Sequence, residues 1–315
     1  MKKFKKLSKS KIKKLNQSER NEYYKNAIEY YGNLPKQLKG YKVKGFFYPL
    51  IFLSMRIFPA KVIKLNEIKW PSDKKAVIFS ANHSNSNDCP SLIQSIGKRF
   101  FALADFTMIN DNVVNISNRI NGCVYVDRKS KSSSDNAFNQ CVDGVKRGYN
   151  MVVFPESTWN LTKSLPILPR YWGDVKIAKE TGRPIIPVIM EYTGKVCLVK
   201  FGNCIYVSKD DSVADKDKEI YEAMVRLKNE IKDSVEYKKH YVPIEYKDWI
   251  EKSLKSYKYF DVLYEMSCIR KDDIIPQKEI DEIIKIGEKI RPMKTIKEEL
   301  KYAKINYRYN DKQGD

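Results

Sequence analysis

Histidine is scarce in this chain: among 315 residues, only His83 and His240 carry an imidazole. Cysteine occurs six times but forms no C-x-x-C pair and no cluster with histidine. These spacings exclude the common zinc motifs, so we expect no metal site. Scattered cysteines in a chain of this size are typical of a reducing compartment, where most of them act as small core residues.

The sequence also lacks an apolar run long enough to cross a bilayer, which needs about 20 residues. The candidate, GFFYPLIFLSMRIF at residues 45–58, is shorter and is interrupted by Arg56. It begins too far into the chain, behind too long a basic stretch, for a secretory signal. This segment therefore predicts neither a transmembrane helix nor a signal peptide.

Acidic residues are nearly missing from the first part of the chain. Residues 1–70 contain 18 lysines and arginines against 4 acidic residues, whereas the whole chain has 59 against 39 and a net charge of +20. A lysine-rich segment followed by an aromatic apolar stretch favours attachment of residues 1–58 to anionic lipids, on the inner, cytoplasmic face of the cell membrane. Two alternatives stay open, a basic tail before a core helix and nucleic-acid binding through lysines. We expect no nucleic-acid partner, because the chain has no glycine–arginine tract and no aromatic RNA-binding signature.

The pattern of apolar residues predicts an α/β fold. From residue 75 onward, β-rich apolar runs alternate with amphipathic segments of helical period, which is typical of a mostly parallel sheet flanked by helices. We divide the chain into a basic, helical, membrane-interfacial segment (1–70), an α/β domain (71–240) and a charged helical C-terminal extension (241–315). Strands are expected at 75–81, 99–105, 122–128, 151–156, after Gly182 and at 195–203, and helices at 89–99, 132–150, 174–182 and 213–235.

The stretch ANHSNSND, residues 81–88, places His83 in a polar turn between an expected strand and an expected helix. Ligands of open α/β sheets bind at the carboxyl ends of the strands. Histidine suits a general base because its ordinary pKa lies near neutral pH. Asp88 can accept the Nδ1 proton and fix the tautomer, which leaves Nε2 to take a proton from a hydroxyl. The alternative role of Asp88 is to cap the following helix.

Four motifs follow one another along the chain. They are H-x(4)-D at His83 and Asp88, G-x-x-[FY]-[VI]-D-R at 122–128, F-P-E-x-T at 154–158 and [IV]-[IV]-P-V at 185–188. In this order and spacing, over about residues 70–210, the chain resembles the PlsC-type glycerolipid acyltransferases.

The resemblance implies transfer of a fatty acyl group from a thioester, on CoA or acyl carrier protein, to a hydroxyl of a lysophospholipid-type acceptor. It implies no cofactor beyond the acyl donor. His83 would deprotonate the hydroxyl, Asp88 would orient His83, and the attack would be direct, without an acyl-enzyme. Further substrate-binding residues carried over from the second and third motifs are Arg128, Glu156, Ser157, Thr158 and Trp159.

The third motif departs from the family pattern F-P-E-G-T-R-S, because this chain reads FPESTWN. Trp159 stands where the family has an arginine that contacts the acceptor phosphate. Asp105 lies near the position where many members of the family have a lysine. An indole offers a flat stacking surface in place of a charge-assisted hydrogen bond. We therefore expect a phosphodiester lysolipid, or a sugar or polyol that stacks on Trp159. Two rivals are transfer of a short acyl group to a cell-envelope glycan and a catalytically silent lipid- or nucleic-acid-binding protein.

Overall fold

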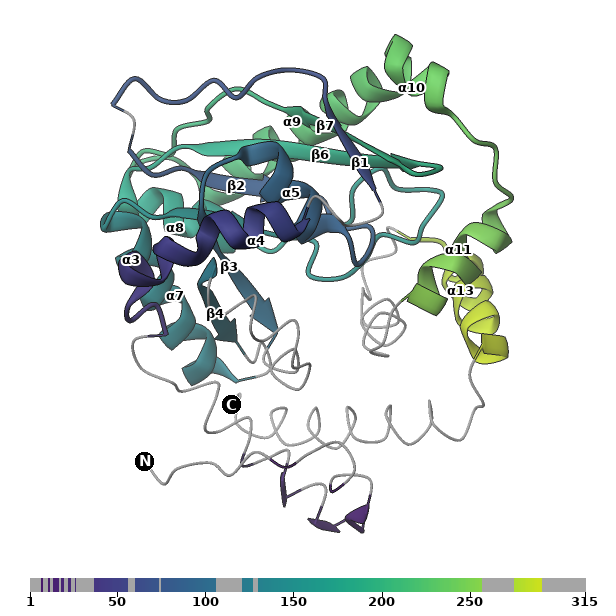
Figure 1. Ribbon diagram of the computed structural model, residues 1–315, viewed down its shortest axis with the longest axis horizontal. Helices are drawn as coiled ribbons and strands as arrows, with labels where there is room; N and C mark the ends of the chain where they lie inside the picture. Colours follow the sequence, from purple (N-terminus) through teal and green to yellow (C-terminus); the bar gives the residue numbers. More distant parts are fainter. Residues whose placement is uncertain are drawn as a thin grey trace.

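The computed structural model describes most of the chain (Figure 1). The described residues are 37–55, 60–73, 75–105, 121–126, 130–256 and 275–290, with a few isolated positions before residue 37. Most of the lysine-rich start and the end of the chain therefore lie outside the described residues, as does Arg128.

A seven-stranded sheet forms the centre of the molecule, in the order β1-β7-β6-β2-β5-β3-β4. Neighbouring strands are parallel except for β6 and β7, which form an antiparallel pair. The prediction of an α/β fold with a mostly parallel sheet is confirmed. The strands are β1 (Lys61–Lys64), β2 (Ile78–Ala81), β3 (Phe100–Asp105), β4 (Cys123–Val126), β5 (Asn150–Val153), β6 (Ile185–Thr193) and β7 (Val196–Phe201).

Helices cover both faces of this sheet (Figure 1). One core joins the sheet to α7 (Lys131–Lys146), α8 (Gly173–Thr181) and α9 (Val213–Asp233). The other core joins it to α4 (Tyr48–Met55) and α5 (Asp88–Ile96). The central strands β2 and β5 are buried on both faces, which explains why their sequences are continuous apolar runs rather than alternating ones.

Local signals in the sequence set the ends of these helices. Ser130 and Ser212 accept hydrogen bonds from the third residue beyond them and so cap α7 and α9. Gly97 and Gly182 end α5 and α8 in the left-handed conformation, which costs glycine little. These boundaries lie within a few residues of the predicted ones.

The strand β1 is an element that the sequence pattern did not reveal. It pairs in parallel with β7, Lys61 opposite Val196, and so adds an edge to the sheet. The sheet therefore includes residues 61–64, which precede the range 71–240 predicted for the α/β domain.

The described part of the C-terminal extension is helical, as expected. It contains α11 (Tyr246–Ser256) and α13 (Gln277–Ile290), and the short helix α10 (Val235–His240) precedes it. The helices α11 and α13 pack against each other, and with Trp159, Leu161 and Leu168 they form a third apolar cluster, separate from the two cores of the sheet.

The N-terminal side of the fold has two short helical turns, α3 (Tyr41–Lys44) and η1 (Gly45–Phe47), which lead into α4. The ring of Tyr41 is buried between Tyr149 and the guanidinium of Arg99, and it covers the start of β4. Gly122, just before β4, has a φ of +94°, and a Cβ there would lie 2.5 Å from the Tyr41 ring.

We expect Gly122→Ala to destabilise the fold more than Gly148→Ala does. Both glycines have a positive φ, which costs an alanine about 1–2 kcal/mol, but a Cβ at Gly148 meets nothing within 4 Å. The clash with Tyr41 should lower the free energy of unfolding by about 1–3 kcal/mol beyond the effect of the control. Urea unfolding of both variants measures the difference, and equal losses would contradict a close approach of Tyr41 to Gly122.

Candidate active site

His83 and Asp88 form a hydrogen-bonded pair at the carboxyl end of β2. The Nδ1 atom of His83 lies 2.6 Å from Oδ2 of Asp88. The strand ends at Ala81, the turn carries His83, and Asp88 is the first residue of α5. The pair thus lies where the sequence places a ligand site, at the strand-to-helix turn of the central parallel strand.

Asp88 is held by more than the imidazole. Its Oδ2 also accepts hydrogen bonds from the backbone N–H groups of Ser84, at 2.7 Å, and Asn85, at 3.1 Å. Its side chain is 1% exposed. The carboxylate therefore binds the amides of the turn that carries the histidine, and the turn wraps around it.

This geometry fixes the tautomer of His83. A carboxylate is an acceptor, so Nδ1 carries the hydrogen and Nε2 keeps its lone pair. Among the described residues, Nε2 has no hydrogen-bond partner. The imidazole stacks on Phe154, with 4.4 Å between the ring centroids, and forms a T-shaped contact with Trp159, with 6.1 Å between the centroids. The side chain of His83 is 19% exposed. A hydroxyl that reached Nε2 would find a proton acceptor held in one orientation.

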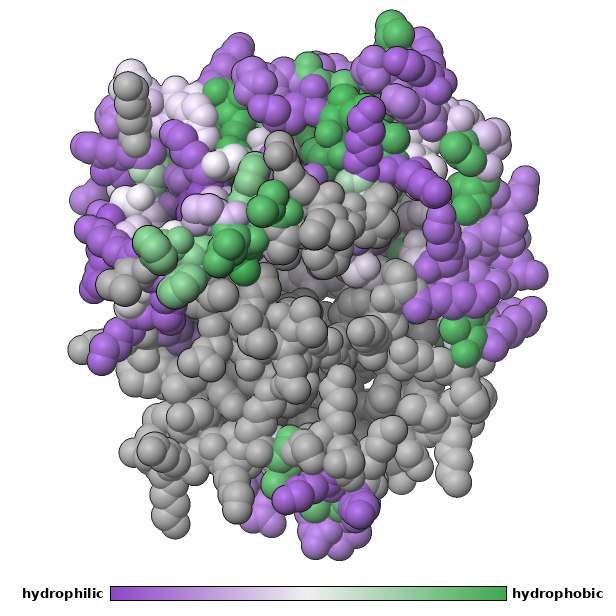
Figure 2. Space-filling view, in the orientation of Figure 1, coloured by the Kyte–Doolittle hydropathy of each residue, from purple (hydrophilic) through white to green (hydrophobic). Residues whose placement is uncertain are grey.

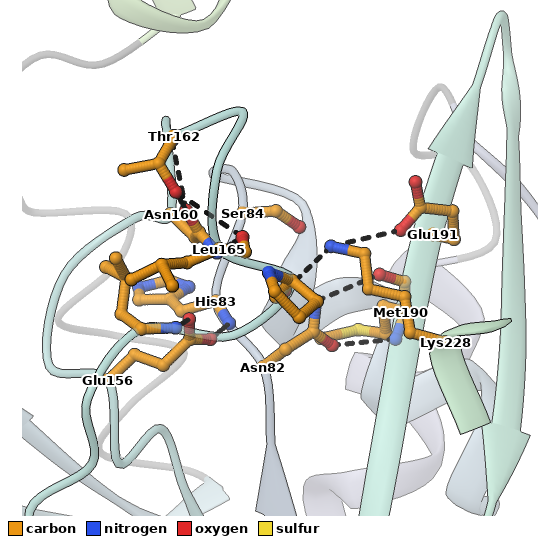
Figure 3. A network of polar contacts seen from close by, with 12 residues as sticks. Asn82, His83, Ser84, Glu156, Asn160, Thr162, Leu165, Met190, Glu191 and Lys228 are labelled. Atoms are coloured by element: carbon orange, nitrogen blue, oxygen red, sulfur yellow. Dashed lines mark hydrogen bonds and ion pairs between the residues drawn. The ribbon is translucent and has the colours of Figure 1, made fainter. Parts of the chain in front are cut away.

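Glu156 contacts the main chain of His83 and not its imidazole. Its Oε1 accepts the backbone N–H of His83 at 2.8 Å, and its Oε2 accepts that of Leu168 at 2.7 Å (Figure 3). Burial raises the pKa of Glu156 to about 7, while the two N–H donors and the charge of Lys228 act to lower it. Both oxygens are occupied by the backbone, so the contacts of Glu156 fix the main chain of His83.

Two asparagines hold the same stretch of chain. The backbone N–H of Asn160 donates to the carbonyl of His83 at 2.8 Å. The side-chain amide of Asn82 pairs with both backbone groups of Met190 on β6 (Figure 3). The sequence did not reveal that Asn82 and Asn160 hold the backbone of this turn, or that Phe154 stacks on the imidazole. The available signal was the position of these residues in or beside the first and third motifs.

The loop that follows Glu156 is bound from several sides. The side chain of Asn160 donates to the carbonyl of Leu165 and accepts from Thr162 (Figure 3). Lys228 of α9 donates to the carbonyl of Pro166 at 2.9 Å and lies 3.6 Å from Glu191. Loop residues with this many hydrogen bonds keep one conformation, so the backbone that supports His83 is rigid.

The remaining residues of the third motif are placed as follows. Trp159 is 2% exposed and packs in the cluster with α11 and α13, so its faces are covered. Thr158 is buried, and its Oγ1 has no hydrogen-bond partner in the described part of the chain. Ser157 has a φ of +61°, a conformation that the family's glycine adopts more easily. Stacking of an acceptor on Trp159 stays a prediction that would require the indole to be uncovered.

Two of the expected residues give no side-chain geometry. Arg128 lies outside the described residues, and the side chain of Asp105 is not described although β3 ends there. In the part of the chain that the structure describes, no group of three or more His, Cys, Asp or Glu residues could hold a metal ion.

The sequence of the α/β unit matches known proteins. Residues 61–191 match the family model described as Acyltransferase. Curated relatives include a 1-acyl-sn-glycerol-3-phosphate acyltransferase from Borreliella burgdorferi, 27% identical over 143 residues, which are 45% of this chain and 56% of that protein. A probable 1-acyl-sn-glycerol-3-phosphate acyltransferase from Mycoplasma pneumoniae is 29% identical over 161 residues, or 50% and 57% of the two chains. This chain thus spans somewhat more than half the length of these relatives.

Among solved structures, the 1-acyl-sn-glycerophosphate acyltransferase PlsC from Thermotoga maritima aligns with 67% of this chain and 90% of its own. The TM-score is 0.48 and the sequence identity is 19%. The match of residues 61–191 to the Acyltransferase family model, together with the four motifs in order, marks this part of the chain as a domain similar to the 1-acyl-sn-glycerol-3-phosphate acyltransferases named above.

Proposed function

We propose that this protein transfers a fatty acyl group from an acyl thioester, carried by CoA or acyl carrier protein, to a hydroxyl of a lysophospholipid-type acceptor. The observation that carries the proposal is the His83–Asp88 pair, in which Nδ1 binds the carboxylate and no described residue binds Nε2. The curated relatives named above, all 1-acyl-sn-glycerol-3-phosphate acyltransferases, support the same reaction class.

In the proposed reaction, Nε2 of His83 removes the proton of the acceptor hydroxyl as its oxygen attacks the thioester carbonyl. The tetrahedral intermediate then collapses, the C–S bond breaks, and the imidazolium returns the proton to the leaving thiolate. Asp88 stabilises the imidazolium while it exists, since it is buried and already accepts the Nδ1 hydrogen. The acyl group passes directly between the two substrates, so no covalent acyl-enzyme forms.

His83→Ala should lower kcat/KM by roughly 10²–10⁴-fold, because it removes the general base. Asp88→Asn should cause a loss of similar order, because an amide no longer holds the imidazole in the same tautomer. His240→Ala is the matched control, since His240 lies on α10 beside Glu236. Initial rates with an acyl-CoA and a lysophospholipid measure these effects, and circular dichroism checks the fold. A His83→Ala variant of full activity would refute the mechanism.

The acceptor is the finer part of the proposal. Trp159 occupies the position of the family's phosphate-binding arginine, and its side chain is buried among apolar residues. That position therefore supplies no positive charge to a phosphomonoester such as lysophosphatidic acid, the first candidate acceptor. This favours the second candidate, which is a phosphodiester lysolipid, a sugar or a polyol.

We expect a panel of acceptors to separate these candidates. Lysophosphatidic acid should be a poorer acceptor than a phosphodiester lysolipid or a neutral polyol lipid. With Trp159 in place of the family's arginine, its phosphate lacks one charge-assisted hydrogen bond, which is worth roughly 1.5–3 kcal/mol. The measurement is kcat/KM for each acceptor with one acyl-CoA. A clear preference for lysophosphatidic acid would refute the second candidate and leave the acyltransferase assignment intact.

The proposed site of action is the inner surface of the cell membrane, with residues 1–58 in contact with anionic lipids. No described helix combines the length and apolar character that a membrane crossing requires. The described part of the segment, η1 and α4, leaves four apolar side chains exposed, and Figure 2 shows hydrophobic residues gathered over these elements. They are Phe46, Phe47, Leu50 and Leu53.

Replacing Phe46 and Leu50 with serine should weaken binding to vesicles that contain anionic phospholipid. Insertion of each side chain is worth on the order of 1 kcal/mol, so the double variant should bind roughly 30-fold more weakly. Val235→Ser, a change of an exposed apolar residue on α10, is the control. Co-sedimentation with vesicles of phosphatidylglycerol and phosphatidylcholine measures binding, and unchanged binding of the double variant would contradict membrane contact through α4.

A further inference from the structure

A buried glutamate on α13 contacts the loop that follows Glu156 in the candidate active site. Glu279, which is 9% exposed, accepts the backbone N–H groups of Lys163 and Ser164 with its Oε1 atom. The hydroxyl of Ser164 donates to its Oε2 at 2.5 Å. Three donors from two consecutive loop residues thus converge on one carboxylate, more than 110 residues away in sequence.

The helix α11 holds the same loop at a second point. The hydroxyl of Tyr246 donates to the carbonyl of Leu161 at 2.7 Å. Between the two polar contacts, Trp159, Leu161 and Leu168 are buried among isoleucines and leucines of α11 and α13, namely Ile250, Leu254, Ile280, Ile283 and Ile286. This loop therefore gains both apolar burial and hydrogen bonds from the extension.

The other side of the loop supports the histidine. The residue after Trp159, Asn160, donates its backbone N–H to the carbonyl of His83. Leu168 at the far end donates to Glu156, which in turn accepts the N–H of His83. The main chain of His83 is thus bound on both its N–H and its carbonyl to a segment whose ends and middle are fixed by α11 and α13.

We propose that α11 and α13 hold the general base in place through this loop, with Glu279 as a positioning residue of the active site. The extension is then part of the catalytic unit rather than an appendage. The role of His83 as base rests on the proposed function, whereas the coupling of Glu279 to His83 is a property of the fold. Loosening the loop lets the imidazole leave its orientation, and a displacement of about 1 Å can cost up to ~10²-fold in rate.

The test compares Glu279→Ala with Glu282→Ala. Glu282 lies on the same helix and approaches the same loop, but only through an ion pair with Lys163 at 3.5 Å in which both side chains are about half exposed. An exposed pair of this kind contributes little. Glu279→Ala should lower kcat by roughly 10- to 100-fold and leave KM for the acyl donor within twofold, whereas Glu282→Ala should change neither by more than twofold.

A spectroscopic readout makes the test independent of activity. The chain has two histidines, so protein labelled with ¹⁵N-histidine gives two sets of imidazole signals, which His240→Gln assigns. Glu279→Ala should shift or broaden the signals of His83 and leave those of His240 in place; Glu282→Ala should move neither. A role of Glu279 in stability alone would lower the urea midpoint but leave the His83 signals and kcat unchanged, and that result would overturn the proposal.

Two milder variants cover the case in which Glu279→Ala does not fold. Glu279→Gln keeps one carbonyl acceptor, and Tyr246→Phe removes only the hydroxyl that bonds Leu161. Each should move the His83 signals in the same direction by a smaller amount. Unchanged His83 signals in both folded variants would refute the coupling. If the unaltered protein transferred no acyl group to any acceptor, the proposed function would fail while the spectra still decided whether Glu279 holds His83.

Discussion

A single buried carboxylate oxygen organises the candidate site. Oδ2 of Asp88 accepts the imidazole Nδ1 and two backbone N–H groups of the turn between β2 and α5. A buried acceptor that pairs with three donors is strongly favoured over any arrangement that leaves those donors unpaired. The same oxygen therefore holds both the imidazole and the turn, so Asp88 contacts His83 and also closes the turn that carries it.

Around this pair the chain builds support from three separate regions. The central strands β2 and β5 are parallel neighbours, so the turns at their carboxyl ends place His83 and Glu156 close together. Asn82 ties the turn to β6, and Lys228 of α9 binds the far end of the loop. The side chains that determine the position of the imidazole thus come from segments spread over much of the described chain.

The sequence predicted the parts of this structure that depend on local pattern. Alternating apolar segments and left-handed glycines such as Gly182 gave the strands and helices of the α/β unit, and the five-residue spacing of His83 and Asp88 gave their contact. The strand β1 was missed because its four residues, of which the first and the last are lysines, carry too short an apolar pattern. The burial of Trp159 and the contacts of Glu279 were not visible either, because they join residues about 100 positions apart and depend on how α11 and α13 pack.

The two outer strands of the sheet are short: β1 and β4 have four residues each. A lysine stands at each end of β1, exposed to solvent. A strand this short, with a charged side chain at each end, is a poor template for pairing with a strand of another molecule. The β1 edge therefore gives two molecules little opportunity to join their sheets and aggregate.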